Sequence, residues 1–253
     1  MIEGGNRKLF QQSPKPNGPL ISVITVTRNA ADCLEKAIQS VQAQTYPNLE
    51  HIILDGASTD NTVEILKKYN DQIAYWKSEP DAGVYNAMNK AVTYARGDWF
   101  LFLGADDELF PGFSQMIEEN IDDENCVYHG CTLWKNMIMG QGYNGYKLAK
   151  ENFSHQAMFY PRAVFDKYRY DEKYIVRADY VLNMQIWADK NFRFEFHPLL
   201  IARYAAGGMS GKVEDEAFKK DRIRLVGKYL GYKNMIRYII KRYKYKRQNF
   251  IEY

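Results

Sequence analysis

The feature that most constrains the fold of this chain is a repeated alternation of short apolar runs and amphipathic segments within the first 110 residues. Four runs of five to eight residues are rich in β-branched and aromatic side chains, which is typical of buried strands. They are LISVITVT (20–27), HIILD (51–55), QIAYWKS (72–78) and WFLFL (99–103). This order predicts an α/β fold with a Rossmann-like, mostly parallel sheet and helices on both faces.

The segments between these runs have helical periodicity. Leu34, Ala37, Ile38 and Val41 recur at i, i+3, i+4 and i+7, which predicts one buried helix face. Asn61 and Glu64 have capping-box spacing and predict the start of a second helix. A third helix carries Val84, Met88, Ala91, Val92 and Ala95 on one face.

The composition bounds the class of protein. With 253 residues and 46% hydrophobic content, the chain is long enough for a sizeable core. It contains no 18-residue apolar run, so we expect no membrane span. Residues 1–18 lack the apolar centre of a secretory signal, and we interpret them as a flexible polar arm.

Three cysteines, Cys33, Cys126 and Cys131, are too few and too scattered for a disulfide framework, which favours a reducing cytoplasm. Cys126, His129 and Cys131 lie close together, but the usual zinc site needs two separated pairs of ligands. We therefore predict two short strands there, joined by a tight turn at Gly130.

Polar residues follow all four predicted strands. The ends are Thr27-Arg28-Asn29, Asp55 to Asp60, Ser78 to Asp81, and Asp106-Asp107. Ligands of open parallel sheets bind beyond the carboxyl ends of the strands, although loops are commonly polar for other reasons. Adjacent carboxylates such as Asp106 and Asp107 need either a counter-charge or open water. A bound cation and a solvated turn are the two interpretations.

The ligand class follows partly by exclusion. The turn after the first strand, T-R-N-A-A-D, lacks the glycines of a dinucleotide fingerprint. Mn²⁺ or Mg²⁺ shared with a substrate diphosphate requires hard oxygen ligands with open coordination positions. Asp106 and Asp107 fit that requirement.

Four motifs carry a resemblance to a known family. ISVITVTRN, ILDGASTDNT, SEPDAGVYNAMNKAV and ARGDWFLFLGADD, in this order and spacing, resemble the family 2 glycosyltransferases of the GT-A fold, in particular the bacterial branch that builds cell-surface polysaccharides. The resemblance implies a nucleotide-sugar-binding half at 19–110 and an acceptor-binding half at 111–212. Residues 213–253 remain as a C-terminal tail.

The resemblance also implies roles for individual residues. The family's metal-binding aspartate falls on Asp106, with Asp107 beside it, and a UDP-sugar is the usual donor. The nucleotide-sugar contacts implied by position are Thr27, Arg28, Asn29, Asp55, Asp81, Asn89, Lys90 and Asp106. Gly104 replaces an aspartate that often contacts the ribose, and Met88 replaces an arginine, for which Lys90 or Arg28 compensates near the diphosphate.

The resemblance implies an inverting transfer, which needs one general base. The family's E-D element corresponds to Ala178-Asp179, so Asp179 is the predicted base. A helix N-cap is the alternative role for Asp179. His155 and Gln156 are candidates for acceptor or phosphate contacts. Arg203, Gly207, Gly208 and Ser210 match a mobile loop over the diphosphate in related enzymes; a Gly-rich linker is the alternative.

The tail differs in charge from the rest of the chain. Residues Lys219 to Arg247 contain twelve Lys and Arg and one acidic residue, which gives a net charge of +11. Because the whole chain has a net charge of +3, the remaining residues carry −8. Apolar residues recur at helical spacing in two stretches around Gly231. Basic amphipathic helices bind anionic membranes, and the alternative is packing on the domain or on a second subunit. No nucleic-acid-binding module accompanies the tail.

These observations predict a metal-dependent, inverting glycosyltransferase that acts at the inner face of the cell membrane on a saccharide acceptor, which we expect to be lipid-linked. A non-catalytic GT-A-like scaffold is the alternative function. A nucleotidyltransferase is disfavoured because its Gly-rich, basic first loop is missing. The donor sugar, the linkage and the presence of a homo-oligomer stay open.

Overall fold

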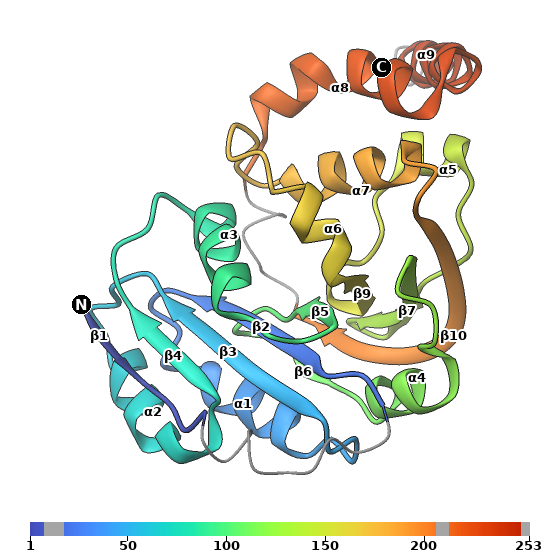
Figure 1. Ribbon diagram of the computed structural model, residues 1–253. Helices are drawn as coiled ribbons and strands as arrows, with labels where there is room; N and C mark the ends of the chain where they lie inside the picture. Colours follow the sequence, from blue (N-terminus) through green and yellow to red (C-terminus); the bar gives the residue numbers. More distant parts are fainter. Residues whose placement is uncertain (8–17, 206–212, 249–253) are drawn as a thin grey trace.

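The predicted alternation forms the first half of the sheet. The computed structural model describes residues 1–7, 18–205 and 213–248. Its four central strands are parallel and lie in the order β4-β3-β2-β5 (Figure 1). They are β2 (Ile21–Thr27), β3 (Leu49–Asp55), β4 (Tyr75–Ser78) and β5 (Trp99–Phe102). Their carboxyl ends therefore meet at one edge of the sheet.

Helices cover both faces of this half. Side chains alternate between the two faces of a strand, so Ile53 packs in one cluster with α1 and α2, whereas Ile52 and Leu54 pack in another with α3. Figure 1 shows α1 and α2 on one side of the sheet and α3 on the other. The helices are α1 (Leu34–Gln42), α2 (Thr62–Lys68) and α3 (Val84–Tyr94), with a short 3-10 turn η2 (Asn70–Gln72) after α2.

The second half continues the same sheet with mixed strand directions. From β5 the order is β9-β7-β10-β6, and β8 pairs with β7. The strands are β6 (Glu108–Leu109), β7 (Cys126–Trp134), β8 (Met137–Met139), β9 (Met158–Pro161) and β10 (Arg193–Tyr204). The helical segments are α4 (Gly112–Asn120), α5 (Gly145–Lys150), η3 (His155–Ala157), α6 (Arg162–Lys167) and α7 (Ala178–Ala188).

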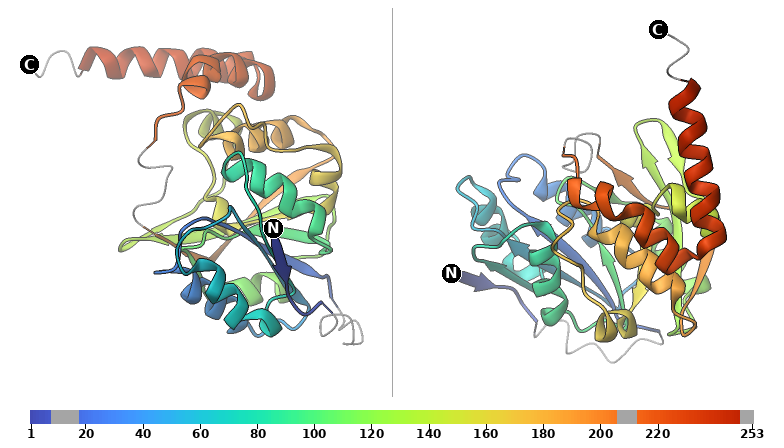
Figure 2. Two further views of the ribbon diagram at one scale, coloured as in Figure 1. Left: turned by 90° about the vertical axis from the view of Figure 1, so that its left-hand side faces the viewer. Right: turned by 90° about the horizontal axis from the view of Figure 1, so that it is seen from above.

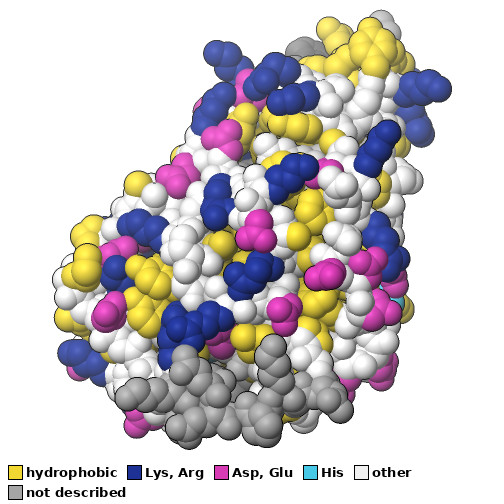
Figure 3. All heavy atoms as spheres, viewed as in Figure 1, with side chains coloured by type: hydrophobic (Ala, Val, Ile, Leu, Met, Phe, Trp, Pro, Cys, Tyr) yellow, Lys and Arg dark blue, Asp and Glu magenta, His cyan; other side chains and the backbone are white. Residues whose placement is uncertain are grey.

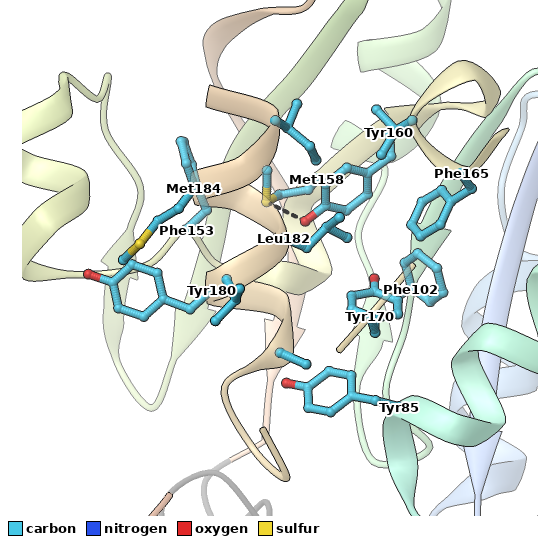
Figure 4. Packing of buried hydrophobic residues seen from close by; sticks show 14 of the residues in the cluster. Tyr85, Phe102, Phe153, Met158, Tyr160, Phe165, Tyr170, Tyr180, Leu182 and Met184 are labelled. Atoms are coloured by element: carbon cyan, nitrogen blue, oxygen red, sulfur yellow. Dashed lines mark hydrogen bonds between the residues drawn. The ribbon is translucent and has the colours of Figure 1, made fainter. Parts of the chain in front are cut away.

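The largest buried cluster joins the two halves. Tyr85 of α3 and Tyr170 have ring centroids 5.1 Å apart, and Phe102 of β5 lies 5.4 Å from Tyr170. Figure 4 shows these rings next to Leu182 and the other buried residues of α7. Aromatic packing of this kind fixes the position of α7 over the end of β5.

The tail forms two helices, α8 (Glu216–Leu230) and α9 (Tyr232–Gln248). The apolar face of α8 is buried through Leu225, Val226 and Leu230 and packs on α7, so for this helix the alternative, packing on the domain, holds in place of membrane contact. The face of α9 with Ile236 and Ile240 stays 40% and 51% exposed. In both views of Figure 2 α9 extends away from the sheet. Within the described residues no helix is long and apolar enough to cross a membrane.

Three local predictions need correction. Residues Ile2–Gly4 form strand β1, which pairs with β4, so this part of the expected arm belongs to the sheet. Gly130 makes no turn, because β7 runs through it and the chain reverses only after Trp134. Helix α2 begins where predicted, but Asn61 makes no capping hydrogen bond; the Asp60 carboxylate instead accepts from the Thr62 N–H at 3.0 Å.

Candidate active site

A cavity of about 660 Å³ lies between the carboxyl end of β5 and helix α7. We call it the large cavity. Asp106 and Asp107 enter it from the loop after β5, and Asp179 enters from the first turn of α7. These three carboxylates therefore line one space, although Asp107 and Asp179 lie 72 positions apart in the sequence. His155 and Gln156 also line this cavity.

The Asp179 carboxylate is held by two donors. The Tyr85 hydroxyl donates to Oδ1 at 2.8 Å, and the Asn152 side-chain amide donates to Oδ2 at 2.6 Å. Asn152 is itself fixed, because its Oδ1 accepts from the Asn183 amide at 2.9 Å, and Asn183 Oδ1 accepts from the buried Tyr160 hydroxyl at 2.8 Å. The N-cap of α7 is Arg177, and it makes no side-chain capping bond. Asp179 is therefore a positioned carboxylate, and the capping alternative is not supported.

The ring groups beneath Asp179 are held neutral by burial. Desolvation and the negative charge of Asp179 raise the pKa of Tyr85 well above its ordinary value, so its hydroxyl remains a donor. His155 Nε2 lies 3.0 Å from the Tyr170 hydroxyl, and its ring stacks on Phe102. Burial lowers the pKa of His155. These buried rings therefore supply hydrogen bonds and no positive charge.

Asp106 and Asp107 lie in different environments. Asp106 is exposed to the cavity. Asp107 is 1% exposed, and its carboxylate accepts from the Ala205 N–H at 2.9 Å and the Gly104 N–H at 3.1 Å. Burial raises the pKa of Asp107 to about 6. Asp106 fits the free ligand that a cation requires, whereas Asp107 connects the β5 loop to the end of β10.

A second cavity of about 400 Å³ lies at the carboxyl ends of β2 and β4. We call it the small cavity. Thr27, Arg28 and Asp81 line it. The Thr27 hydroxyl is buried and has no hydrogen-bond partner among the described residues, and a buried unpaired hydroxyl indicates a missing ligand or water. Val84 and Tyr85 line both cavities, so the two spaces adjoin.

Asp55 and Asn29 shape the loops around the small cavity. The Asp55 carboxylate is 1% exposed and accepts from the Ser58 N–H at 3.0 Å and the Ser78 hydroxyl at 2.6 Å. Asn29 has a φ of 52°, and its side-chain oxygen accepts from the Thr59 N–H at 2.9 Å. Neither residue lines either cavity. Their roles as nucleotide contacts stay predictions.

Asn89 and Lys90 are engaged with protein groups. The Asn89 amide donates to the Tyr170 carbonyl at 2.9 Å and accepts from the Tyr170 N–H at 3.0 Å. Lys90 Nζ lies 3.4 Å from Glu79 and donates to the Pro80 carbonyl at 3.1 Å. In this structure Arg28 is the nearer of the two predicted basic groups to the small cavity, because Lys90 does not line it.

The predicted loop after β10 is only partly described. Arg203 is exposed on β10 and lies over the Phe110 ring at 5.6 Å, and it lines neither cavity. Gly207, Gly208 and Ser210 lie outside the described residues. Gln156 contacts the Asp107 carboxylate with its side chain.

Sequence reasoning missed three residues of the site. Tyr85 and Asn152 hold Asp179, and Arg177 lines the large cavity without an ion pair among the described residues. Arg177 lies two positions before Asp179, and this closeness in the sequence could have identified it as a residue of the site. Tyr85 lies 94 residues from Asp179, and no local pattern links the two.

Comparison with known proteins identifies the family. A family model described as glycosyl transferase family 2 matches residues 22–181. The chain belongs to this family. The predicted resemblance and the predicted class of enzyme, a glycosyltransferase, are therefore confirmed.

Individual relatives agree with this assignment. The chain is 31% identical over 214 residues to the PGL/p-HBAD biosynthesis glycosyltransferase of Mycobacterium bovis (strain BCG / Pasteur 1173P2), covering 80% of this chain and 83% of the relative. Among solved structures it is similar to S. aureus TarS 1-349 in complex with UDP-GlcNAc, with a TM-score of 0.65, 20% identity, and coverage of 82% of this chain and 65% of TarS 1-349. It thus spans just under two thirds of that protein.

A second solved structure is similar as well. The mannosyltransferase PcManGT from Pyrobaculum calidifontis, in complex with GDP-Man and Mn²⁺, has a TM-score of 0.62 and 16% identity, covering 87% of this chain and 67% of the other. At these identities the likeness shows the fold, and the α/β GT-A fold predicted from the sequence is confirmed.

The residues present fit a divalent cation only in part. Among the described residues no group of three or more His, Cys, Asp or Glu side chains is placed to hold a metal ion. Mg²⁺ commonly binds one or two carboxylates together with substrate phosphates and water. The exposed Asp106 fits that arrangement, and a cation held there would need its remaining ligands from a substrate phosphate and water.

Proposed function

We propose that this glycosyltransferase moves a sugar from a nucleotide-sugar, a UDP-sugar in the first instance, to a saccharide acceptor with inversion at the anomeric carbon. The observation that carries the proposal is that Asp106 and Asp179 line one cavity while the small cavity opens beside it. The nucleotide then occupies the small cavity, and the transferred sugar and the acceptor meet in the large one.

In the proposed donor complex, Thr27 and Arg28 contact the nucleotide, and Asp81 also lines its cavity. The unpaired Thr27 hydroxyl gains a partner on binding. Arg177 and Arg28 offer positive charge to the diphosphate, a common use of arginine. A cation bound by Asp106, Mn²⁺ or Mg²⁺, would supply charge stabilisation to the leaving diphosphate.

Asp179 acts as the general base in this proposal. One of its oxygens accepts the proton of the acceptor hydroxyl as that oxygen attacks the anomeric carbon. The Tyr85 and Asn152 donors keep the carboxylate oriented. No covalent intermediate is needed, because a single displacement inverts the configuration.

A turnover assay tests the proposal. The full chain is incubated with a panel of nucleotide-sugars, Mn²⁺ and saccharide acceptors, and release of the nucleoside diphosphate is measured. We expect release with one donor and its loss, by at least 100-fold, in Asp106→Ala. Glu118→Gln, an exposed change on α4, is the matched control. No release with any donor, or an unaffected Asp106→Ala, would favour the non-catalytic scaffold.

We further propose that the acceptor is lipid-linked and that α9 holds the enzyme at an anionic membrane, facing the cytoplasm. Ile236, Ile240 and Tyr243 share one helical face and are 40%, 51% and 71% exposed. Figure 3 shows Lys and Arg side chains beside exposed hydrophobic ones over this part of the molecule. Basic and apolar groups on one helix suit an anionic bilayer surface.

Vesicle sedimentation tests the membrane contact. Binding to phosphatidylglycerol vesicles should fall at least fivefold in Ile240→Ser and should weaken with salt, since each surface charge contributes about 1 kcal/mol. Ile2→Ser, which changes an exposed isoleucine on β1, should bind as the wild type does. Equal binding to uncharged vesicles, or no effect of Ile240→Ser, would contradict the proposal.

A further inference from the structure

Strand β8 exposes three consecutive apolar side chains beside the large cavity. Met137, Ile138 and Met139 are 55%, 67% and 43% exposed. Among the described strands β8 pairs with β7 alone, so it is an edge. Proteins usually protect edge strands with charges or bulges, and a contiguous exposed apolar run is typical of a binding surface.

The fold fixes this strand relative to the cavity. Gly140 follows β8, and a Cβ there would lie 2.7 Å from Cys131 Sγ and 2.8 Å from Cys131 Cα. Only glycine permits so close an approach to β7. The register pairs Met139 with Thr132 and Ile138 with Leu133. The apolar side chains are therefore held at a defined place, and they are not part of a loose loop.

Two of the three side chains belong to the cavity that contains Asp179. Ile138 and Met139 line it, and Met137 does not. The adjoining wall is aromatic, since the Tyr143 and Phe153 ring centroids lie 4.0 Å apart and His129 lies 4.8 Å from Phe153. Burial lowers the pKa of His129 to about 4, so the imidazole is neutral near pH 7. Ile138, Met139 and the aromatic rings thus form apolar walls in this cavity, whose lining also includes Gln141 and Glu151.

The nucleotide-sugar is not expected to contact this apolar wall. In the proposed complex its nucleotide occupies the small cavity, which shares Val84 and Tyr85 with the large one, and its sugar and diphosphate are polar. The acceptor is the reactant that reaches the end of the large cavity near β8. We propose that Ile138 and Met139, with the Tyr143 wall, form a subsite for a hydrocarbon chain carried by the acceptor sugar. The inference rests on the proposed sugar transfer for its biological role.

A binding measurement tests the subsite without turnover. The full chain is labelled with ¹³C at the methionine methyl groups and titrated with octyl β-glucoside below its critical micelle concentration, or with methyl β-glucoside. We expect a saturable shift of the Met139 signal with the octyl compound and none with the methyl compound, because each buried methylene contributes about fourfold in affinity. The Met137 signal is the internal control, and Met137→Leu and Met139→Leu provide the assignments.

Matched variants sharpen the test. Ile138→Ser should weaken octyl glucoside binding about fivefold or more, and Ile138→Leu should keep it within about twofold. Met137→Ser removes a similar exposed group outside the cavity and should also stay within about twofold. With an active donor, wild type should prefer octyl over methyl glycosides about tenfold or more in kcat/KM, and Ile138→Ser should lose most of that preference.

Three outcomes would overturn the subsite. The first is that the Met139 signal does not saturate with octyl β-glucoside. The second is that Met137 and Met139 shift together, or shift only with phosphatidylglycerol vesicles, which would make β8 a membrane-binding edge. The third is that Ile138→Ser binds octyl β-glucoside as tightly as the wild type. A separate result, in which the octyl compound binds at Met139 but no nucleotide-sugar supports transfer, would refute the proposed function and leave the hydrocarbon subsite standing.

Discussion

The two cavities of this protein are built in different ways. The small cavity is lined mainly by the first half of the sheet, where Thr27 ends β2, Arg28 follows it and Asp81 lies in the loop after β4. The start of α3 completes most of the lining, and only Glu172 and Ile175 come from the second half. The large cavity collects side chains from distant segments, such as Asp107, Asn152 and Asp179. The first site is therefore a product of local topology, and the second depends on the packing of α7 and β7 on the sheet.

The difference lies also in how polar groups are held. In the small cavity the Thr27 hydroxyl has no partner within the part of the chain that the structure describes, and Arg28 is exposed, which suits groups that meet a ligand. In the large cavity the Asp179 carboxylate is bound by Tyr85 and Asn152 before any ligand arrives. A site for binding needs unpaired groups, whereas a site for catalysis needs preorganised ones.

The largest expected effect tests whether the large cavity is the catalytic one. Asp179→Asn removes the base and keeps the size of the side chain, and general-base catalysis contributes about 10²–10⁴ in rate. We expect kcat to fall about 10³-fold with the donor KM changed less than about threefold, measured by diphosphate release. Glu118→Gln serves as the control. Retention of more than a tenth of kcat would show that another group takes the proton.

The next test asks whether the hydrogen bonds to Asp179 matter. Tyr85→Phe keeps the ring packing on Tyr170 and deletes the 2.8 Å bond to Asp179. A hydrogen bond to a charged group contributes about 1.5–3 kcal/mol, so kcat should fall about 10–100-fold. The donor KM should change less than about threefold, because this bond orients the base and does not contact the nucleotide. A kcat within about twofold of the wild-type value would show that the bond does not matter for the reaction.

The pH dependence of stability tests the packing of the acceptor-binding half. Burial lowers the pKa of His129 from its ordinary value of 6.5 to about 4. The unfolded chain then binds more protons than the folded one between about pH 4 and 6.5, so stability falls as the pH falls through that window. Between pH 7.5 and 5 the wild type should lose about 2 kcal/mol more than His129→Phe, measured by denaturant unfolding. If the wild type and His129→Phe lost the same free energy of unfolding between these two pH values, His129 would be protonated in the folded state.

The smallest expected effect concerns the small cavity. A Cβ at Gly56 would collide with the Asp81 carboxylate, so Gly56→Ala must displace one wall of the proposed nucleotide site. We expect the donor KM to rise about fivefold with kcat within about twofold, the pattern of lost ground-state binding. Gly142→Ala, where an added Cβ meets nothing within 4 Å, is the matched control. A fall in kcat without a change in the donor KM would contradict the assignment of nucleotide binding to the small cavity and catalysis to the large one.

Local patterns predicted the strands and the polar loops at their ends, but not the hydrogen bonds that hold side chains in the large cavity, for a physical reason. Strand periodicity located β2 to β5 and the polar residues at their ends, because both patterns are local. The partners of Asp179 could not be predicted, since Tyr85 and Asn152 reach it only through the tertiary fold. Asp106 and Asp107 looked equivalent as neighbours, yet burial separates them. The turn placed at Gly130 was wrong because β7 is covered on both sides and needs no polar break.

The central claim is that one nucleotide-sugar spans the small cavity and reaches Asp106 in the large one. A crystal structure of the full chain soaked with UDP and Mn²⁺ tests it most directly. We predict the nucleoside beside Thr27 and Arg28, with the diphosphate and the cation at Asp106. A nucleotide bound elsewhere, or a cation bound with no contact to Asp106, would contradict the account.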